Sequence, residues 1–224
     1  MSTILNIDTS LETASVSITR DSVLLQSKVN TIQKEHASFL HHAIKDLLAQ
    51  SSIDIKQLDA IAVTNGPGSY TGLRVGLASA KGLCYALNKP LITIGSLNVL
   101  AAAAINASGE IISDTTLFCP MIDARRMEIY TAVFDRNMKE ILPPCAMILH
   151  ENSFAEILQN SRIIFFGSGA SKWCSISKSA NASFINELDT IPAICRLAAE
   201  KFATEKFTDL TYSEPLYIKE FFTP

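Results

Sequence analysis

Glycines and hydroxyl side chains gather in one segment of the chain, Gly66-Pro67-Gly68-Ser69-Tyr70-Thr71-Gly72-Leu73-Arg74-Val75-Gly76. Gly66 and Gly68 flank a proline, which allows a sharp turn into a helix that Ser69 or Thr71 can cap. Free amides at a helix start can hold an anion such as phosphate. A tight turn without a ligand is the simpler explanation, and the spacing is not that of a P-loop, GxxxxGK[ST].

Small residues also recur along the helix that this turn is expected to start. Gly72, Gly76 and Ala80 are four residues apart, and Ser79 lies beside them. Glycine inside a helix costs roughly 1 kcal/mol relative to alanine, so two glycines on one stripe indicate a close approach of another helix or strand. Small-xxx-small spacing permits such an approach. The neighbour is either a partner protein or the protein's own sheet, and the spacing alone does not distinguish the two.

Two acidic residues stand where a phosphotransferase of the fold expected below would have its phosphate hairpins. Asp8 and Thr9 follow the first expected strand, but no glycine lets the backbone approach a phosphate there. Asp123 is followed closely by Arg125 and Arg126, which are bulky. The two aspartates could converge on a magnesium ion; we expect instead that Asp8 caps a turn and that an arginine binds an acidic group across an interface. The residues of this weak nucleotide or anion site are Asp8, Thr9, Gly66, Gly68, Ser69, Asp123 and Arg125.

The composition limits the class of protein. The chain has 224 residues, 48% of them hydrophobic and 18% charged, which is typical of a globular protein. A net charge of −3 without clustered Lys or Arg argues against binding nucleic acid unaided. Five cysteines without a CxxC pair favour buried, reduced thiols. No leader peptide is evident, and the alanine-rich run at 97–105 is too short to cross a membrane, so we expect a cytoplasmic protein.

Hydrophobic periodicity predicts the elements that position these residues. The same order is stated twice: three strands, a helix, a strand, a helix and a strand. In the first half the expected ranges are Thr3 to Asp8, Thr13 to Arg20, Val23 to Val29, Lys34 to Gln50 (helix), Leu58 to Thr64, Ser69 to Leu87 (helix) and Pro90 to Ile94. In the second half they are Leu117 to Asp123, Glu128 to Phe134, Ala146 to Leu149, Ser153 to Gln159 (helix), Arg162 to Phe166, a helix or turn, Ala182 to Ile185, and a closing helix from Ile191 to Phe207.

This repeated order predicts an α/β protein with mixed sheets flanked by helices. It matches the duplicated fold of the actin-like ATPase (ASKHA, ribonuclease-H-like) superfamily. We expect residues 1–98, with about 208–224, to form the first subdomain, and residues 99–207 to form the second.

Four blocks in the same order along the chain resemble the TsaB (YeaZ) family. The first is the segment 66–76 followed by Ala80-Lys81-Gly82-Leu83, and it is highly specific. Ile7-Asp8-Thr9-Ser10 and the strand after it are similar to the family's opening. Asp123-Ala124-Arg125-Arg126-Met127-Glu128-Ile129-Tyr130 resembles its D-x-R-R-x-E-V-Y block, and Glu214-Pro215-Leu216-Tyr217-Ile218-Lys219 resembles its closing P-x-Y-L-R. The segment 36–42 departs from the usual H-S-E-x-L-L-P.

The resemblance implies a subunit with no catalysis and no cofactor of its own. It implies pairing with a TsaD-like paralogue, with a TsaE-like ATPase, to form N6-threonylcarbamoyladenosine at position 37 of ANN-decoding tRNAs. ATP and metal would then reside on the partner subunits, and tRNA would be met only through the complex. The contact, with TsaD or with a second copy in a homodimer, would use the two helices of the first half. The expected interface residues are His36, Phe39, Leu40, Ala43, Tyr70, Thr71, Gly72, Arg74, Val75, Gly76 and Ser79.

Two enzymatic alternatives remain to be weighed. The first is an ATP-dependent phosphotransferase or ATPase, which the two hairpins argue against. The second is a glycoprotease-like metallopeptidase, since TsaD-type relatives bind metal through HxxxH. Here Leu40 stands four residues after His36, and His41 and His42 are turned off its face, so the second ligand is missing. Neither HExxH nor GxSxG occurs.

Overall fold

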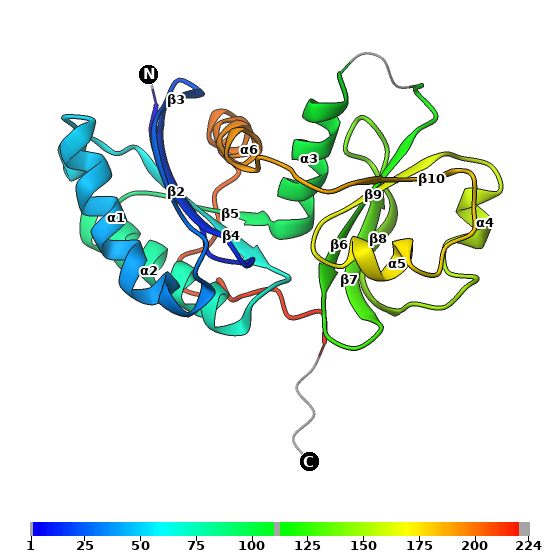
Figure 1. Cartoon of the computed structure of the whole chain (residues 1–224). Coiled ribbons are helices and arrows are strands. Elements are labelled where there is room, and N and C mark those ends of the chain that lie inside the picture. The colour runs from blue at the N-terminus through cyan, green and yellow to red at the C-terminus, as the bar shows by residue number, and fades with distance from the viewer. Residues whose placement is uncertain (1, 110–112, 220–224) are drawn as a thin grey trace. The chain divides into compact units, whose positions relative to one another are not determined.

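The computed structural model describes residues 2–109 and 113–219. They form two compact units, each built on one five-stranded sheet. The first unit comprises Met1–Ser96 and Ile191–Leu216, and the second comprises Leu97–Thr190 and Tyr217–Pro224. Along the chain, therefore, the second unit is inserted between two segments of the first, as the colours of Figure 1 show.

The sheet of the first unit joins an antiparallel meander to two parallel strands. Its strand order is β3-β2-β1-β4-β5. The strands are β1 (Thr3–Asp8), β2 (Ala14–Arg20), β3 (Val23–Asn30), β4 (Ala60–Gly66) and β5 (Leu91–Gly95). Strand β1 pairs antiparallel with β2 and parallel with β4. Every residue of β1 is buried, as expected for a central strand whose two faces are both covered.

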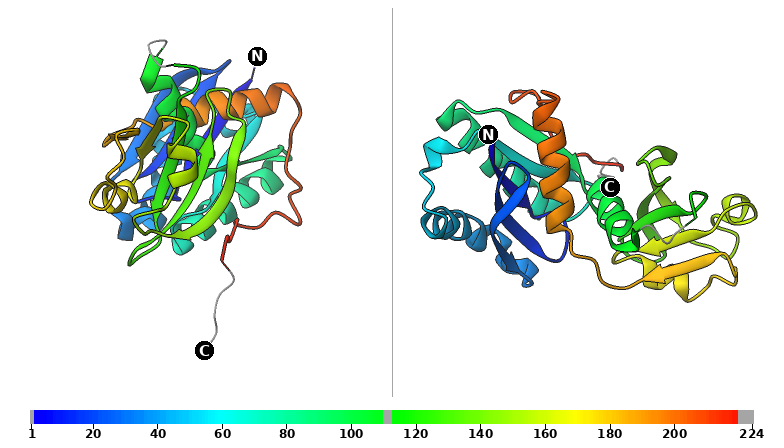
Figure 2. Two further views of the ribbon diagram at one scale, coloured as in Figure 1. Left: turned by 90° about the vertical axis from the view of Figure 1, so that its right-hand side faces the viewer. Right: turned by 90° about the horizontal axis from the view of Figure 1, so that it is seen from above.

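Helices cover both faces of this sheet (Figures 1 and 2). Helices α1 (His36–Gln50) and α2 (Tyr70–Leu87) lie on one face, and α6 (Ile191–Ala203) lies on the other. The short 3-10 turns η1 (Gln33–Glu35) and η2 (Ile55–Gln57) precede α1 and β4. The core under α1 and α2 includes Leu5, Val16, Leu40, Leu47 and Leu77, and each such fully buried side chain contributes roughly 1.5–3 kcal/mol.

The sheet of the second unit repeats the arrangement of the first. Its order, β10-β9-β6-β7-β8, is the same connectivity read from the opposite edge. The strands are β6 (Leu117–Asp123), β7 (Glu128–Phe134), β8 (Glu140–Ile148), β9 (Ile163–Phe166) and β10 (Ala182–Ile185). Strand β6 again pairs antiparallel with the next strand and parallel with the fourth. The expected duplicated α/β fold is therefore confirmed.

Strand β8 is longer than expected. It begins at Glu140, whereas the sequence pattern predicts a strand only from Ala146. Pro143 and Pro144 argue against a strand because proline cannot donate to a sheet ladder. Strand β8 lies at the edge of the sheet, where an irregular register between Thr131 and Val133 of β7 accommodates the prolines.

Three helices and an aromatic core complete the second unit. They are α3 (Ser96–Ser108), α4 (Ala155–Leu158) and α5 (Ala170–Cys174). Helix α3 has no counterpart among the predicted elements; its alanines at 101–104 are all buried. Phe154 and Trp173 meet edge to face with ring centroids 5.5 Å apart, and Phe165 packs against both rings.

Among the helices of residues 2–109 and 113–219, none combines the length and the apolar character that a membrane span requires.

The boundaries of the units differ from those expected from the sequence. Residues 191–207 were expected in the second subdomain, but α6 packs against β1, β2, β3 and β5 of the first sheet. Ala193, Ile194 and Ala198 of α6 are buried, and the Cys195 thiol adds contacts with Ser17 Oγ at 3.3 Å and Asn6 Nδ2 at 3.7 Å. The following segment adds a bridge between Thr208 and Leu91. The second unit begins at Leu97 and also takes the residues from Tyr217 onward, of which 220–224 lie outside the described residues.

The five thiols differ in accessibility. Cys84, Cys119 and Cys195 are buried, Cys145 is half-buried and Cys174 is exposed, so the expectation of buried thiols fails at Cys174. Burial raises the pKa of Cys84 to about 11, because the thiolate would lose its hydration. The pKa of Cys119 is raised for the same reason, despite its contact with Thr131 Oγ1.

We expect a thiol reagent at neutral pH to modify Cys174 first, because the thiolate is the reactive species and only this thiol is fully accessible. The buried thiols should react only after unfolding. Mass spectrometry of the labelled native chain, with Cys174→Ser as the control, measures the order. Early modification of Cys84 in the folded chain would contradict the packing described above.

Candidate functional site

The turn between β4 and α2 is built as its glycines suggest. Strand β4 ends at Gly66, whose φ of 116° suits glycine and disfavours any side chain. The Gly66–Pro67 peptide bond is cis. Ser69 caps α2, and its hydroxyl accepts a hydrogen bond from the Gly72 amide at 3.3 Å. Of the two caps suggested by the sequence, Ser69 is the one used.

The loop after β1 fills the space in front of this turn. The Ser69 amide donates to the Ser10 carbonyl oxygen at 2.7 Å, and Thr9 Oγ1 donates to the Gly72 carbonyl oxygen at 2.7 Å. A Cβ on Gly68 would collide with the Ser10 carbonyl oxygen. The Ser69 amide, which could have held an anion, is thus occupied by the protein's own backbone.

The glycine stripe of α2 serves internal packing. A Cβ on Gly72 would collide with the Thr9 carbonyl oxygen, and a Cβ on Gly76 would collide with Thr9 Oγ1. Gly72, Gly76 and Ala80 are all buried in the first unit. The spacing allows either a partner or the protein's own sheet as the neighbour, and the structure shows the protein's own loop after β1. This corrects the expectation that Gly72 and Gly76 face a partner.

Asp8 satisfies its carboxylate within the same loop. It is 3% exposed, and its Oδ1 accepts hydrogen bonds from the Ser10 amide at 2.9 Å, the Ser10 hydroxyl at 2.7 Å and the Thr64 hydroxyl at 2.8 Å. Asp8 therefore stabilises the turn after β1, in the capping role expected from the sequence. Asp8, Thr9, Gly66, Gly68 and Ser69 do lie together, but they bind one another.

Asp123 and Arg125 belong to the second unit, at the hairpin between β6 and β7. Arg125 and Arg126 adopt φ angles of 72° and 50°, a left-handed conformation that glycine favours. The Asp123 carboxylate accepts from the Arg125 amide at 2.5 Å and pairs with Lys172 Nζ at 2.7 Å. The hairpin thus keeps a glycine-like backbone but carries two exposed guanidinium side chains.

The expected interface residues divide into buried and accessible groups. His36, Leu40 and Ala43 lie on the buried side of α1, and Phe39 is partly buried against the same core. The structure therefore uses these four for internal packing, because the apolar face of α1 must cover the sheet. Those that reach the surface, fully or in part, are Phe39, Tyr70, Thr71, Arg74, Val75 and Ser79; Phe39 and Val75 also pack partly against the core.

The outer face of α2 carries small residues that the sequence pattern did not single out. Ala78, Gly82 and Ala86 are spaced by four residues and are all exposed. A Cβ on Gly82 would meet nothing within 4 Å. Tyr85 lies on the same face and is 83% exposed. The four-residue spacing of small residues seen at Gly72 and Gly76 therefore recurs on the exposed side of the same helix.

The histidines of α1 do not form a metal site. His36 is buried and its Nε2 lies 3.1 Å from the Glu12 carbonyl oxygen, whereas His41 Nε2 lies 3.3 Å from Ser79 Oγ. Over residues 2–109 and 113–219, no group of three or more His, Cys, Asp or Glu side chains is arranged to hold a metal ion.

Comparison with known proteins identifies the family. The profile of the family described as "TsaD: tRNA N6-adenosine threonylcarbamoyltransferase" matches residues 25–211. The chain belongs to this family. Among its curated relatives, the "tRNA threonylcarbamoyladenosine biosynthesis protein TsaB" of Escherichia coli is 26% identical over 223 residues, 96% of this chain and 94% of the relative. That of Bacillus subtilis is 34% identical over 132 residues, which span 59% of this chain and only about half, 55%, of the relative.

A solved structure agrees with these relatives. "YeaZ from Pseudomonas aeruginosa" superposes with a TM-score of 0.79 at 24% identity, over 97% of this chain and all of that one. This likeness shows the shared fold. The curated relatives confirm the resemblance to the TsaB (YeaZ) family.

The two glycine positions of α2 predict opposite effects on stability. Gly76→Leu should lower the free energy of unfolding by about 1–3 kcal/mol, because the larger side chain overpacks the contact with Thr9. Gly82→Ala should raise it by roughly 0.5–1 kcal/mol, because alanine is the better helix former and has space there. Urea unfolding followed by circular dichroism measures both. An unaffected Gly76→Leu chain would contradict the internal role of the stripe.

The pair of Asp123 and Lys172 predicts a dependence on pH. Burial disfavours the charge of Asp123, but the hydrogen bonds from Lys172 and the Arg125 amide outweigh burial and lower the pKa of the carboxyl. The stabilisation is therefore present above the unfolded pKa of about 3.9 and is lost as the pH falls through the lower folded value.

Asp123→Asn should destabilise the chain at neutral pH by no more than about 1 kcal/mol, since the pair is partly exposed. The difference in stability from the wild type should shrink once the Asp123 carboxyl of the wild type is protonated in both the folded and the unfolded chain. Urea unfolding at neutral and acidic pH measures it, with Asp114→Asn, from a looser exposed pair with Arg136, as the control. A difference that grows on acidification would contradict the assignment.

Proposed function

We propose that the chain is a partner subunit without catalysis of its own, which binds a TsaD-type paralogue in forming N6-threonylcarbamoyladenosine in tRNA. A TsaE-type ATPase completes the system, and tRNA is bound through the complex. The names of the curated relatives support the pathway, and the family profile supports kinship with the transferase. The net charge of −3 fits a subunit that leaves RNA binding to others.

The observation that carries the proposal is the exposed outer face of α2. Gly82 costs the helix roughly 1 kcal/mol and gains no internal contact in return. Ala78 and Ala86 extend the same low surface one turn in each direction. A face without long side chains lets the backbone of a second helix come close, which compensates for the glycine only when a partner is bound.

Larger side chains border this face at both ends. Arg74 stacks over the ring of Tyr70, with the guanidinium carbon 4.0 Å from the ring centroid. Tyr70 is 42% exposed, and Tyr85 stands at the other end of the helix. Tyrosine and arginine are the residues that most often supply binding energy in interfaces. Small residues in the middle of this surface would let a partner come close, and the larger side chains toward its ends would supply binding energy. We call this surface the α2 outer face (Tyr70, Arg74, Ala78, Gly82, Tyr85 and Ala86).

The loop contacts of the first unit support the absence of catalysis. A phosphotransferase needs backbone amides and a carboxylate directed at phosphate and metal. Here Asp8 Oδ1 accepts three internal hydrogen bonds, and the Ser69 amide is bound to Ser10. The chain's own loop therefore takes the place that a nucleotide phosphate would need, and ATP and metal are assigned to the partner subunits.

Ala78→Arg tests the proposal. The long side chain has room in the isolated chain, so the circular dichroism spectrum and unfolding midpoint should stay unchanged. Binding to the TsaD-type protein of the same organism should weaken at least about tenfold, or ~1.4 kcal/mol, because the close approach is blocked. Co-expression, size exclusion and calorimetric titration measure the loss.

Ala203→Arg is the matched control, because Ala203 is exposed at the end of α6 on the opposite face of the same sheet. It should bind as the wild type does. An Ala78→Arg chain that co-elutes unchanged would contradict the assignment of the α2 outer face.

A further inference from the structure

The hairpin between β6 and β7 holds two arginines on a backbone that suits glycine. Arg125 and Arg126 are consecutive, and both φ angles are positive, 72° and 50°. Glycine reaches this region without steric cost, whereas a residue with a Cβ reaches it only at a cost in conformational energy. Backbone strain of this kind is concentrated at functional sites. Two arginines at these positions therefore need an explanation beyond the turn itself.

The fold gives these two side chains no internal role. Both are exposed, and neither guanidinium has a hydrogen bond or an ion pair within the part of the chain that the structure describes. Main-chain groups close the turn instead: the Glu128 amide donates to the Arg125 carbonyl oxygen at 3.1 Å, and the Ala124 amide donates to the Glu128 carbonyl oxygen at 3.1 Å. Glycine at both positions would keep these contacts, so the hairpin does not require the arginine side chains.

The two carboxylates that flank the arginines along the hairpin are already neutralised. Asp123 pairs with Lys172 Nζ at 2.7 Å, and Glu128 pairs with Lys219 Nζ at 2.6 Å. Lys172 Nζ also donates to the Glu128 carbonyl oxygen at 3.0 Å, which fixes it in place. Four cations and two carboxylates thus leave the hairpin with an excess of two positive charges. We call the two exposed guanidinium groups of Arg125 and Arg126 the arginine tip.

An anion is the ligand that fits the arginine tip, and a phosphate fits it better than a carboxylate of a protein. A planar guanidinium donates two parallel hydrogen bonds to either group. Stable protein interfaces add a buried apolar centre to such pairs, but Met127, 38% exposed, is the one large apolar side chain that residues 124–128 expose. A nucleic-acid backbone requires no apolar centre and offers phosphates in series, one for each guanidinium.

We propose that Arg125 and Arg126 bind two backbone phosphates of the tRNA when the chain is in complex with its TsaD-type partner. This inference rests on the proposed function, in which tRNA is bound through the complex. Two phosphate contacts are too few to hold RNA alone, in agreement with the net charge of −3. The arginine tip belongs to the second unit and the α2 outer face to the first, so the two surfaces can be tested separately.

Salt dependence tests the contact, because each phosphate contact adds about 0.7–0.9 to the slope of log affinity against log salt concentration. The wild-type chain and Arg125→Gln/Arg126→Gln are each co-expressed with the TsaD-type protein of the same organism. Fluorescence anisotropy then measures binding of a labelled, unmodified ANN-decoding tRNA over a range of potassium chloride concentrations. The variant complex should bind at least about tenfold more weakly, and its slope should fall by roughly 1.4–1.8.

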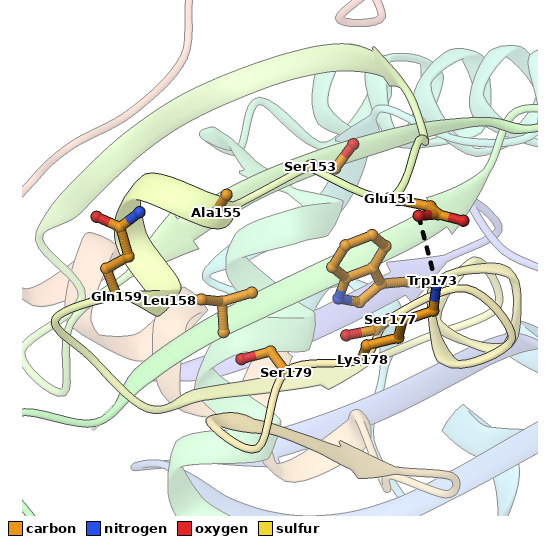
Figure 3. Close-up of a pocket in the computed structure, with 9 residues that line it drawn as sticks. All are labelled: Glu151, Ser153, Ala155, Leu158, Gln159, Trp173, Ser177, Lys178 and Ser179. Atoms are coloured by element: carbon orange, nitrogen blue, oxygen red, sulfur yellow. Dashed lines mark hydrogen bonds and ion pairs between the residues drawn. The ribbon is translucent and has the colours of Figure 1, made fainter.

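Lys139→Gln/Lys178→Gln is the matched control, because it removes the same charge from exposed side chains of the same unit. Lys139 lies in the turn at the other end of β7, and Lys178 pairs with Glu151 at 3.5 Å beside the pocket drawn in Figure 3. The complex that carries this variant should bind tRNA with the affinity and the slope of the wild type.

Arg125→Gly/Arg126→Gly separates binding from stability. Glycine adopts the left-handed backbone freely, so the midpoint of urea unfolding should rise. Binding of tRNA should nevertheless be as weak as in the glutamine variant. A fall in the midpoint would show that the arginine side chains support the fold, and it would overturn the proposal.

Three further outcomes overturn the proposal. The first is an unchanged slope in the glutamine variant. The second is an equal loss in the lysine control, which would show that the general charge of the unit is used and not the arginine tip. The third is loss of co-elution with the TsaD-type partner, which would show that the arginines bind an acidic group of that protein. Failure of the wild-type complex to form, or to bind tRNA, would instead count against the proposed function.

Discussion

The contact of the Thr9–Ser10 backbone with the glycine-rich start of α2 determines how the first unit is arranged. Main chain meets main chain there, since the Ser69 amide binds the Ser10 carbonyl oxygen and side chains are excluded at Gly68 and Gly72. The loop that ends β1 is thereby closed against a helix, and the Asp8 carboxylate is satisfied inside it. The loop after β1 is thus occupied by the start of the protein's own helix.

The same contact decides which side of α2 faces outward. Because the inner glycines bring the helix down onto the loop and sheet, the opposite face must point outward. Small residues at Ala78, Gly82 and Ala86 then stand exposed, with aromatic and cationic side chains at either end. The helix thus carries small residues on two sides, one packed against the loop and sheet and the other exposed.

Much of this arrangement follows from the sequence. Strands β1, β6, β7 and β10 have the expected bounds, and the repeated order predicts both sheets. The direction of the glycine stripe could also have been found, because Gly72 and Gly76 share a side of the helix with Leu73, Leu77 and Cys84, which belong in a core. The free guanidinium groups at the β6–β7 hairpin could not, because they depend on lysines of distant segments, Lys172 and Lys219, that pair with the carboxylates beside them.

The route of the chain through the two units bears on its synthesis. Helix α6 covers one face of the first sheet, but the chain reaches it only after the whole second unit. During translation, β1 to β5 therefore emerge long before their second cover, and their apolar residues on that face stay exposed meanwhile. Domains otherwise tend to fold in order as they leave the ribosome. The inserted order therefore delays the completion of the first unit until α6, synthesised last among its helices, can pack on the sheet.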